Sequence, residues 1–480
     1  MIRTPLWSHQ REALEFAASR PGAILAMEMG TGKSLTALAV ADRVRARRIL
    51  IASPLSVVRV WPREIESHVA EPWAALALDR GSVARKAADA AAHLELAEAR
   101  DLPAVLVVNH ESAWREPFRT LALRTPWDLV IIDEIHRAKA AGGKLSRFCA
   151  ELGLRTPRRL GLTGTPMPHS ALDLYAQCRA IDRSVFGTSY QRFKLRYAVM
   201  GGYQNHQVVA FQHMDELAAK FARVAYQARK ADVLDLPEEV HAERTCTLEP
   251  GARRLYQQIE REFYAEVGRG EVTAANALVK LLRLQQITSG MLKLDSGEMS
   301  HVSYAKEELL LDVLEDVTEP VVVFARFSAD LDAIARVAER LGRAYGEVSG
   351  RRKDLDDARY PAGVDVLGVQ IQAGGVGIDL TRASVGIFYS TGFSLSEYLQ
   401  ACGRLHRHGQ HRAVTFLHLI AEGTIDERVL VALRRREEVV SAILSLASEK
   451  RKHGEEAGKE LPEERREDVF GGGMHQARMG

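Results

Sequence analysis

The chain has 480 residues, which is enough for two large domains or three ordinary ones. Its composition, 46% hydrophobic and 27% charged, is that of a soluble globular protein with enough apolar surface for folded cores. Lys and Arg number 65 and Asp and Glu 63, so the formal net charge of +2 excludes a global basic field, and any nucleic acid would occupy a local groove.

The first part of the chain alternates short apolar runs with helical stretches. The runs lack polar alternation and are bounded by turn residues, which is typical of buried parallel strands in an α/β sheet. Helices are expected over 8–19, 33–46 and 83–98. The expected strands lie at 23–26, 49–52, 104–108, 129–132 and 159–162.

The same pattern returns after a helix-rich stretch from about 170 to 315. Its apolar runs lie at 321–324, 364–369, 385–389 and 415–419. The sequence therefore predicts an α/β protein with two tandem parallel-sheet lobes and a helical connecting region. We place the first lobe, with its helical extension, at 1–235 and the second lobe at 236–445.

The remaining segment, 446–480, is expected to be a charged, disordered tail. Between Glu449 and Asp468, 14 of 20 residues are charged, eight acidic and six basic. Three glycines follow at 471–473. Such a segment cannot bury a core.

A glycine-rich turn follows the first expected strand, where 27–34 reads Met-Glu-Met-Gly-Thr-Gly-Lys-Ser. Glycines let backbone N–H groups surround phosphate oxygens, the lysine reaches the β- and γ-phosphates, and the serine hydroxyl binds Mg²⁺. Met27 replaces the first glycine of the general pattern, and the alternative is a helix-capping turn with an unrelated lysine. The expected ligands are ATP and Mg²⁺, and the candidate residues are Met29, Gly30, Thr31, Gly32, Lys33 and Ser34.

Two adjacent carboxylates, Asp133 and Glu134, follow the strand expected at 129–132. The carboxyl end of a parallel strand borders the crevice where open α/β sheets bind ligands. Asp133 can hold Mg²⁺ through water, and Glu134 can accept a proton from the attacking water. Such a pair can also be a simple helix cap. Beside a phosphate loop, it favours ATP hydrolysis.

Two later elements narrow the class of ATPase. Thr163 and Thr165 end a strand with two hydroxyls that are suited to sense the γ-phosphate and couple it to movement. Gln400, Arg404 and Arg407 are spaced i, i+4 and i+7 on an expected helix, so all three face one way. Two arginines from a second lobe can stabilise a transition-state phosphate. The alternative is a basic helix on the surface.

Together these motifs resemble those of superfamily II helicase-type motors, specifically the Swi/Snf-type ATPases that include DNA translocases and chromatin remodellers. The resemblance runs from about residue 5 to 430. It implies two RecA-like lobes and DNA-dependent ATP hydrolysis, with Lys33, Asp133 and Glu134 in one half-site. In the other half-site, Arg407 matches the family's arginine finger and Arg404 its companion.

Further nucleotide contacts follow from the same resemblance. The segment 6–10 resembles the N-terminal glutamine motif, in which Gln10 would recognise adenine, and 373–381 resembles motif five, with Gly377 and Asp379. Asp379 stands where Asn is common, and His169 replaces an Asn after the Thr-Gly-Thr-Pro motif. The short region between the lobes, with no appended histone-reading or DNA-reading module, points to a compact motor of a prokaryote or a virus.

The resemblance also implies a groove across both lobes that contacts mainly the backbone phosphates of double-stranded DNA. Hydroxyls and backbone amides bind phosphate without reading bases, so little sequence specificity is expected. Basic clusters at 43–48 and 351–353 either extend this groove or are solvated faces. The candidate contacts are Ser53, Asn109, His110, Arg326, Gly374 and Gly375.

Several features favour a cytoplasmic location. No stretch approaches the roughly 18 apolar residues of a membrane span, and residues 1–7 contain no apolar leader region. The four scattered cysteines predict neither disulfides nor a zinc framework and fit a reducing compartment. We expect a monomeric motor with no membrane partner, bound to the nucleoid or, if viral, working in the host cytoplasm. A recruiting protein partner is compatible with this assignment.

Three functions are compared. The first is an ATP-driven translocase that moves along double-stranded DNA and remodels protein–DNA complexes without separating strands. The second is a strand-separating DNA or RNA helicase, and the third is a nucleotide-dependent DNA clamp that does not hydrolyse ATP. The complete set of catalytic candidates argues against the clamp. Only the 18 residues 382–399 separate motifs five and six, which leaves no room for a strand-separating hairpin and favours the translocase.

Overall fold

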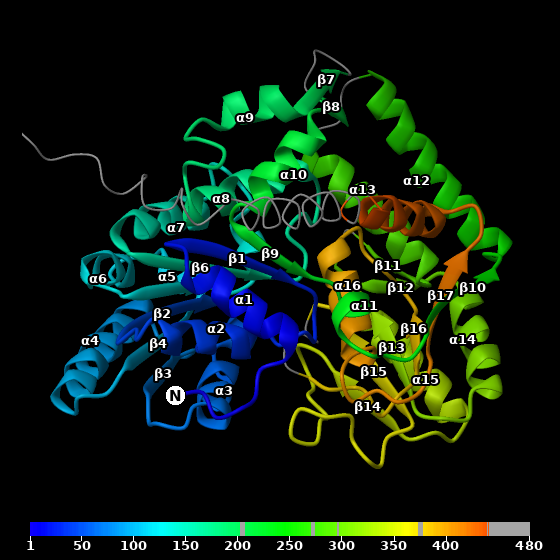
Figure 1. Ribbon diagram of the computed structural model, residues 1–480. Coiled ribbons are helices and arrows are strands. Elements are labelled where there is room, and N and C mark those ends of the chain that lie inside the picture. The colour runs from blue at the N-terminus through cyan, green and yellow to red at the C-terminus, as the bar shows by residue number, and fades with distance from the viewer. Residues whose placement is uncertain (202–206, 270–273, 295–296, 373–377, 439, 441–480) are drawn as a thin grey trace, which may run out of the picture.

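The computed structural model describes residues 1–201, 207–269, 274–294, 297–372, 378–438 and 440. Two α/β lobes lie side by side, and helices α11 and α16 lie between their sheets (Figure 1). The tail expected at 446–480 lies outside the described residues. Among the helices that are described, none is both long and apolar enough to cross a membrane.

In the described part of the chain, seven parallel strands form the sheet of the first lobe, in the order β3-β4-β2-β5-β6-β1-β9. Its inner strands are continuously apolar because helices cover both faces. The strands are β1 (Gly22–Met27), β2 (Arg48–Ser53), β3 (Ala74–Leu78), β4 (Ala104–Asn109), β5 (Leu129–Ile132), β6 (Arg158–Thr163) and β9 (Ala225–Ala228).

Successive residues of a strand point to opposite faces, which divides the core of this lobe into two clusters. Leu25 packs on one face and Ile24 on the other. One face carries α1 (Ser8–Ala18), α2 (Lys33–Arg43) and α3 (Val60–His68). The other carries α4 (Val83–Ala99), α5 (His110–Ala113), α6 (Phe118–Arg124), α7 (Lys144–Arg155), α8 (Leu174–Ile181) and α10 (Met214–Ala222).

A small extension lies between α8 and α10. It consists of α9 (Tyr190–Tyr197) and an antiparallel hairpin of β7 (Ala198–Gly201) and β8 (Gln207–Phe211). Three short 3₁₀ turns complete the lobe, at Leu55–Val57, Ile135–Ala138 and Ala171–Asp173. The hairpin was not expected from the sequence.

The second lobe has a parallel sheet of six strands among the described residues, in the order β10-β17-β16-β13-β15-β14. The strands are β10 (Glu239–Cys246), β13 (Val321–Ala325), β14 (Tyr345–Val348), β15 (Val366–Gln370), β16 (Val385–Phe388) and β17 (Val414–Ala421). The helices are α12 (Pro250–Arg269), α13 (Ala274–Thr288), α14 (Ala305–Asp316), α15 (Ser328–Arg340), α16 (Leu395–Leu405) and one over 425–438.

The predicted fold class, α/β with two parallel-sheet lobes, is confirmed. Within the two parallel sheets, four of the described strands were missed: β3, β9, β10 and β14. All four are edge strands, one at each end of each sheet. An edge strand pairs on one side only and tolerates polar residues, so it need not form an apolar run. β10, for example, has the sequence Glu-Val-His-Ala-Glu-Arg-Thr-Cys.

The connection between the lobes is short. β9 pairs with β1, residues 229–238 follow with the single turn of α11 (Lys230–Val233), and β10 begins the second sheet. The first sheet thus draws on residues 22–228 and the second on 239–421. The division at 235/236 remains a prediction.

The segment that separates motifs five and six, 382–399, is described in full and contains no hairpin. Strand β16 and helix α16 occupy it, as the spacing predicted. The second lobe does contain a small hairpin elsewhere, formed by β11 (Met291–Lys293) and β12 (Met299–His301). Its strands are three residues long each.

Candidate ATP-hydrolysis site between the lobes

The glycine-rich loop joins β1 to α2. Gly30 and Gly32 have φ angles of +85° and +81°, a left-handed conformation that favours glycine. A Cβ on Gly32 would lie 2.0 Å from Gln10 Nε2. Lys33 begins α2, and its Nζ donates to the carbonyl oxygens of Met27 at 2.8 Å and Glu28 at 3.1 Å. The loop therefore has the backbone conformation that the phosphate-loop prediction requires.

Gln10 is held against this loop. Its Oε1 accepts the Trp7 N–H at 2.9 Å, and its Nε2 donates to the carbonyl oxygen of Thr31 at 3.2 Å. The ring of Trp7 lies 5.4 Å from that of His408, a residue of the second lobe that follows Arg407. The predicted adenine contact thus lies beside the phosphate loop, at a point where the two lobes touch.

Asp133 and Glu134 lie just beyond the end of β5 and are both buried. Trp61 Nε1 donates to Asp133 Oδ2 at 3.2 Å. Glu134 has a left-handed backbone, φ 49° and ψ 51°, which is a strained conformation for a residue with a side chain. Its carboxylate forms an ion pair with His136 Nδ1 at 3.2 Å. Gln400 of the second lobe donates to its other oxygen at 3.4 Å.

The two carboxylates differ in how readily they ionise. Burial, together with the charge of Glu134, raises the pKa of Asp133 to about 7. Burial also acts to raise the pKa of Glu134, but the hydrogen bond and charge of His136, with the charge of Lys33, outweigh it and hold that pKa at about 2. Glu134 is thus an ionised acceptor for a proton, and at Asp133 the charge of Lys33 only partly offsets the rise in pKa.

The predicted coupling residues meet in a network that crosses between the lobes. His136 Nδ1 lies 3.1 Å from Thr163 Oγ1, and Thr165 Oγ1 donates to Ser396 Oγ at 3.1 Å. Ser396, on α16 of the second lobe, also lies 3.3 Å from His136 Nε2. The sequence analysis missed Ser396, although it precedes Gln400 by one helical turn and so shares its face.

The arginine pair lies at the end of α16, close to the phosphate loop. A Cβ on Gly403 would lie 2.8 Å from Met29 Sδ, and one on Gly30 would lie 3.3 Å from Arg407 Cβ. Arg404 is 4% exposed, and its Nε and Nη2 have no hydrogen-bond partner among the described residues. Burial, helped by the charge of Arg407, lowers its pKa to about 10.

These groups fit an anionic nucleotide. Buried, unpaired guanidinium N–H groups are costly unless an anion accepts from them. Met29 of the loop contacts Gly403 of α16, and the charge of Arg404 acts on Lys33. Mg²⁺ would be held by Ser34, in the first turn of α2, together with Asp133. Asp379 accepts from Thr381 N at 3.0 Å, and its charge acts on Arg404. Gly377 lies outside the described residues.

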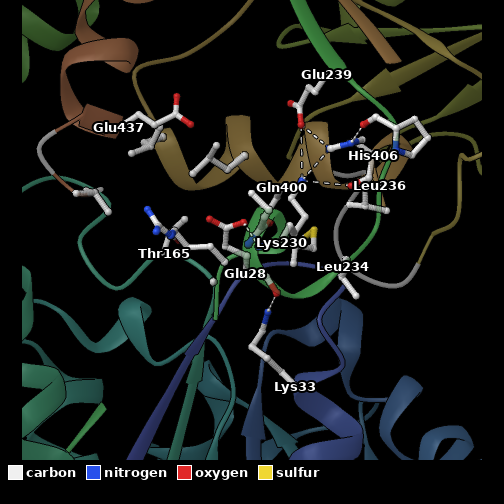
Figure 2. Close-up of a pocket in the computed structure, with 18 of the residues that line it drawn as sticks. Glu28, Lys33, Thr165, Lys230, Leu234, Leu236, Glu239, Gln400, His406 and Glu437 are labelled. Carbon is white, nitrogen blue, oxygen red and sulfur yellow. Dashed lines mark hydrogen bonds and ion pairs between the residues drawn. The ribbon is translucent and has the colours of Figure 1, made fainter. Parts of the chain in front are cut away.

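A cavity of about 630 Å³ opens between the lobes beside these residues (Figure 2). Lys33, Glu134 and Thr165 contribute to its wall from the first lobe, and Gln400 and His406 from the second. Much of the remaining lining comes from the connecting segment 229–239, which sequence reasoning did not assign to the site.

A second, larger groove of about 980 Å³ crosses the lobes on the predicted nucleic-acid side. Its lining includes Glu134 and Gln400, which also line the first cavity. Further lining residues are Ser56, Asn109, Glu111, Arg137 and Lys139 of the first lobe and Gln372, Ser394 and Glu397 of the second.

Two residues predicted to contact nucleic acid, Ser53 and His110, have buried side chains. Ser53 is fully buried, and its hydroxyl donates to Pro54 O at 3.3 Å. His110 is 2% exposed, and burial with the charge of Arg137 lowers its pKa to about 4, so it is neutral. Ser53 is the last residue of β2 and His110 directly follows β4. The polar residues that line the groove come later in the chain, at Ser56 and Glu111. Asn109 does line the groove.

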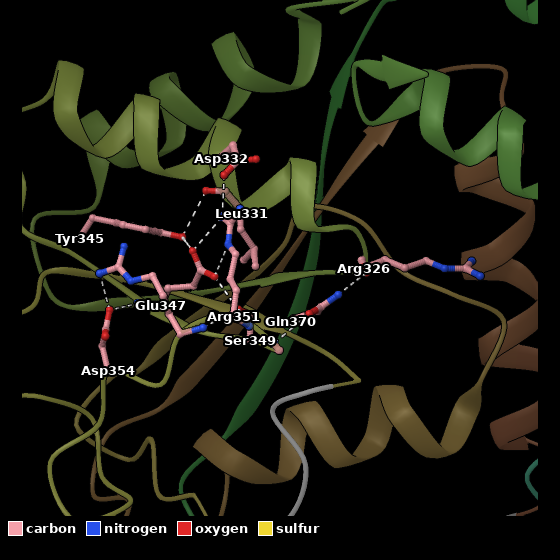
Figure 3. Close-up of polar contacts among 11 residues, drawn as sticks. Arg326, Leu331, Asp332, Tyr345, Glu347, Ser349, Arg351, Asp354 and Gln370 are labelled. Atoms are coloured by element: carbon pink, nitrogen blue, oxygen red, sulfur yellow. Dashed lines mark hydrogen bonds and ion pairs between the residues drawn. The ribbon is translucent and has the colours of Figure 1, made fainter. Parts of the chain in front are cut away.

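Of the other predicted contacts, Arg326 directly follows strand β13 of the second sheet. The Arg326 guanidinium donates to Gln285, and its backbone oxygen accepts from Gln370 at 3.4 Å (Figure 3). Burial lowers the pKa of Arg326, and the opposite charge of Glu397 partly offsets this effect. Gly374 and Gly375 lie outside the described residues.

The two basic clusters are largely neutralised within the protein. Arg351 forms ion pairs with Glu347 at 2.8 Å and Asp332 at 2.6 Å, and Arg352 pairs with Asp354 at 2.6 Å (Figure 3). In the first lobe the pairs are Arg43–Glu15, Arg47–Asp101 and Arg48–Glu98. These residues form solvated ion-pair faces, as the alternative interpretation of the sequence held.

The two-lobed architecture and this site define a helicase-like ATPase, and comparison with known families agrees. Residues 9–291 match the SNF2-related domain, and residues 305–409 match the helicase conserved C-terminal domain. The first match alone spans more than half of the chain. The chain therefore belongs to the SNF2-related family, and the predicted class, an ATP-hydrolysing enzyme with helicase-like lobes, is confirmed.

Relatives come from animals, bacteria and phages. A Caenorhabditis elegans homologue of SWI/SNF-related matrix-associated actin-dependent regulator of chromatin subfamily A-like protein 1 is 29% identical over 92% of this chain and 62% of that protein. A protein of Acyrthosiphon pisum secondary endosymbiont phage 1 is 25% identical over 84% of this chain and 90% of its own length. An uncharacterized ATP-dependent helicase of Mycoplasma pneumoniae is 24% identical over 92% of this chain and 42% of that protein.

The chain thus spans about two fifths to two thirds of the nematode and Mycoplasma relatives. Among solved structures, the Sulfolobus solfataricus SWI2/SNF2 ATPase core in complex with dsDNA is 23% identical. The alignment covers 96% of this chain and 97% of that chain, with a TM-score of 0.43.

The positions of Lys33 and Glu134 yield a prediction. Lys33→Ala is expected to abolish ATP turnover, because the phosphate loop loses its cation. Glu134→Gln is expected to retain ATP binding and to lower turnover by roughly 10²-fold or more, because an amide cannot take the proton of the attacking water. Steady-state hydrolysis and a nucleotide-binding titration measure the two effects. The exposed Glu95→Gln variant of α4 is the control, and wild-type turnover by Glu134→Gln would exclude the proposed base.

The arginine pair yields a second prediction. Arg407→Ala is expected to lower turnover by roughly 10³-fold with a far smaller change in nucleotide affinity, because its charge is needed mainly in the transition state. Arg412→Ala is a matched control, since Arg412 follows closely in sequence but pairs with Glu319 at an exposed position. Equal losses in kcat and in binding affinity would contradict a role in the transition state.

The division of the site predicts the behaviour of a fragment. Residues 1–235 include the whole first sheet, Lys33 and Glu134, but neither arginine. This fragment is expected to bind ATP and to show no DNA-stimulated hydrolysis. Calorimetry and a phosphate-release assay, each run beside the full chain, test both statements. Turnover by the fragment at the stimulated full-length rate would mean that the second lobe supplies nothing essential.

Proposed function

We propose that this protein is an ATP-dependent motor that translocates along double-stranded DNA and remodels protein–DNA complexes. One observation carries the proposal: Glu134 and Gln400 line both the cavity beside the phosphate loop and the groove across the lobes. A polymer in that groove would touch the elements that hold the hydrolytic carboxylate. Binding of DNA and hydrolysis of ATP would therefore act on the same few residues.

The chemistry follows from the two half-sites. The N–H groups of the glycine loop and Lys33 bind the phosphates, and Glu134 accepts the proton of the attacking water. Arg404 and Arg407 stabilise the charge that develops in the transition state. When bound at Ser34 and Asp133, Mg²⁺ supplies further charge neutralisation. The arginines come from the other lobe, so hydrolysis requires the lobes to be closed.

The groove is suited to backbone phosphates. Ser56 offers a hydroxyl, and Arg137 and Lys139 offer positive charge, while the Asn109 amide in the same lining donates to Glu111 at 3.0 Å. These groups bind phosphate without reading base edges, so the motor can step along any sequence. Glu111, Glu134 and Glu397 also line the groove, so its lining is not strongly positive.

The spacing of elements favours translocation over strand separation. A helicase needs a wedge that splits the duplex, and the described segment 378–405 holds only β16 and α16. A motor without a wedge can still step, because each ATP cycle opens and closes the groove around the phosphate backbone. The strand-separating helicase remains the competing function, and the non-hydrolysing clamp is disfavoured by the complete catalytic set.

We also propose that the motor works as a monomer, because one chain supplies both half-sites. Its substrate would place it at the nucleoid or, for a viral protein, in the host cytoplasm. A protein partner that recruits the motor to its target is compatible with this function. The working division of the chain remains 1–235 and 236–445.

The proposed function predicts which polymer stimulates hydrolysis. Duplex DNA is expected to stimulate ATP turnover, and the protein is expected to displace the third strand of a DNA triplex without unwinding a blunt or tailed duplex. Turnover is measured with duplex DNA, single-stranded DNA and RNA, with Lys33→Ala as the inactive control in the triplex assay. Efficient unwinding of a tailed duplex, or stimulation by RNA but not by duplex DNA, would favour the helicase function instead.

A further inference from the structure

The connecting segment 229–238 is fastened to the phosphate loop before it crosses to the second lobe. The backbone N–H of Glu28 donates to Ala228 O at 2.9 Å, and the Glu28 carboxylate accepts the backbone N–H of Lys230 at 2.9 Å. The segment then leads into β10, the edge strand of the second sheet. Movement of the phosphate loop is therefore transmitted to the first residues of the connection.

The same connection holds His406 of the second lobe from several sides (Figure 2). The Glu239 carboxylate, at the start of β10, lies 2.5 Å from His406 Nδ1. The carbonyl oxygen of Pro237 lies 2.8 Å from Nε2. Lys230 Nζ donates to the carbonyl oxygen of His406 at 3.2 Å. The His406 side chain is only 10% exposed, so solvent screens the ion pair with Glu239 weakly.

His406 lies where the arginine helix ends. Helix α16 ends at Leu405, and the His406 N–H donates to Cys402 O at 3.0 Å while its backbone turns away from the helix, with φ −95° and ψ 85°. Arg404 lies two residues before it and Arg407 directly after it. A fixed imidazole therefore sets the direction in which Arg407 leaves the helix.

We propose that Glu239 is a positioning residue for the arginine pair and acts through His406, while Lys230 connects the same histidine to the phosphate loop through Glu28. The inference rests on the proposed function, because it gives the connecting segment a part in ATP hydrolysis. Glu239 itself has no contact with the catalytic carboxylates or with either arginine in the described structure. Its effect is geometric: a displacement of about 1 Å in a catalytic group can cost on the order of 10²-fold in rate.

The test compares variants of two glutamates on one strand. Glu239→Ala removes the contacts of this carboxylate with His406 and His241, whereas Glu243→Ala, the matched control, removes an exposed ion pair with Arg434 at 2.9 Å. We expect Glu239→Ala to lower DNA-stimulated kcat by about 10-fold or more and to change the KM for ATP by less than about threefold, because positioning acts mainly in the transition state. The thermal unfolding midpoint should match that of the control.

A double-mutant cycle asks whether the effect passes through His406. In a His406→Ala background, Glu239→Ala is expected to cause no further loss of kcat, because the two residues act as a unit. Losses that multiply would overturn the proposal. If Glu239→Ala lowers the unfolding midpoint, the Glu239→Gln variant is tested in its place, since it retains the shape of the side chain but loses its charge. We expect this variant to lower kcat by about threefold. A Gln variant that hydrolyses at the control's rate also overturns it.

The wild-type protein, assayed in parallel, distinguishes a failure of the proposed function from a failure of the positioning role of Glu239. A wild-type chain without nucleic-acid-stimulated hydrolysis would overturn the proposed function and this inference together. A normal wild-type chain with a Glu239→Ala variant at the control's rate would overturn this inference alone.

Discussion

The close approach of α16 to the phosphate loop is the contact on which the rest of the site depends. Gly403 lies against the Met29 side chain, and Gly30 lies against Arg407 Cβ, so a Cβ at either glycine would force the neighbouring atoms to shift. This approach places Arg404 beside Glu134 and lets Ser396 and Gln400 reach the first lobe. The half-sites lie more than 250 residues apart in sequence, and the packing of one helix on one loop assembles them.

That packing buries several charges whose partners are incomplete. Lys33, Asp133, Glu134 and Arg404 are all deeply placed, and burial acts against the charged form of each. Unpaired buried charge is costly to maintain. A nucleotide with its cation would satisfy these groups, so its binding would favour the closed arrangement. The strained backbone of Glu134 fits the same account, since strain persists where the surroundings hold a functional residue in place.

The sequence predicted the centre of the molecule better than its edges. The apolar inner strands and the phosphate loop stand out locally, because burial on both faces and phosphate binding each impose a short pattern. Edge strands such as β10 show no such short sequence pattern. Ser396, Lys230 and Glu239 were missed because each acts through a contact with a distant segment. The burial of Ser53 and His110 was not foreseen, because motif resemblance gives position along a strand but not which side chains reach solvent.

Closure of the lobes on DNA and nucleotide is the central claim, and a distance between the lobes tests it most directly. Spin labels at Leu96→Cys on α4 and Glu339→Cys on α15, both exposed positions, would report that distance by pulsed electron resonance. We expect duplex DNA with a slowly hydrolysed ATP analogue to give one narrow distribution that matches this structure, and the free protein to give a broader one. The same distribution with and without these ligands would contradict a site assembled by closure.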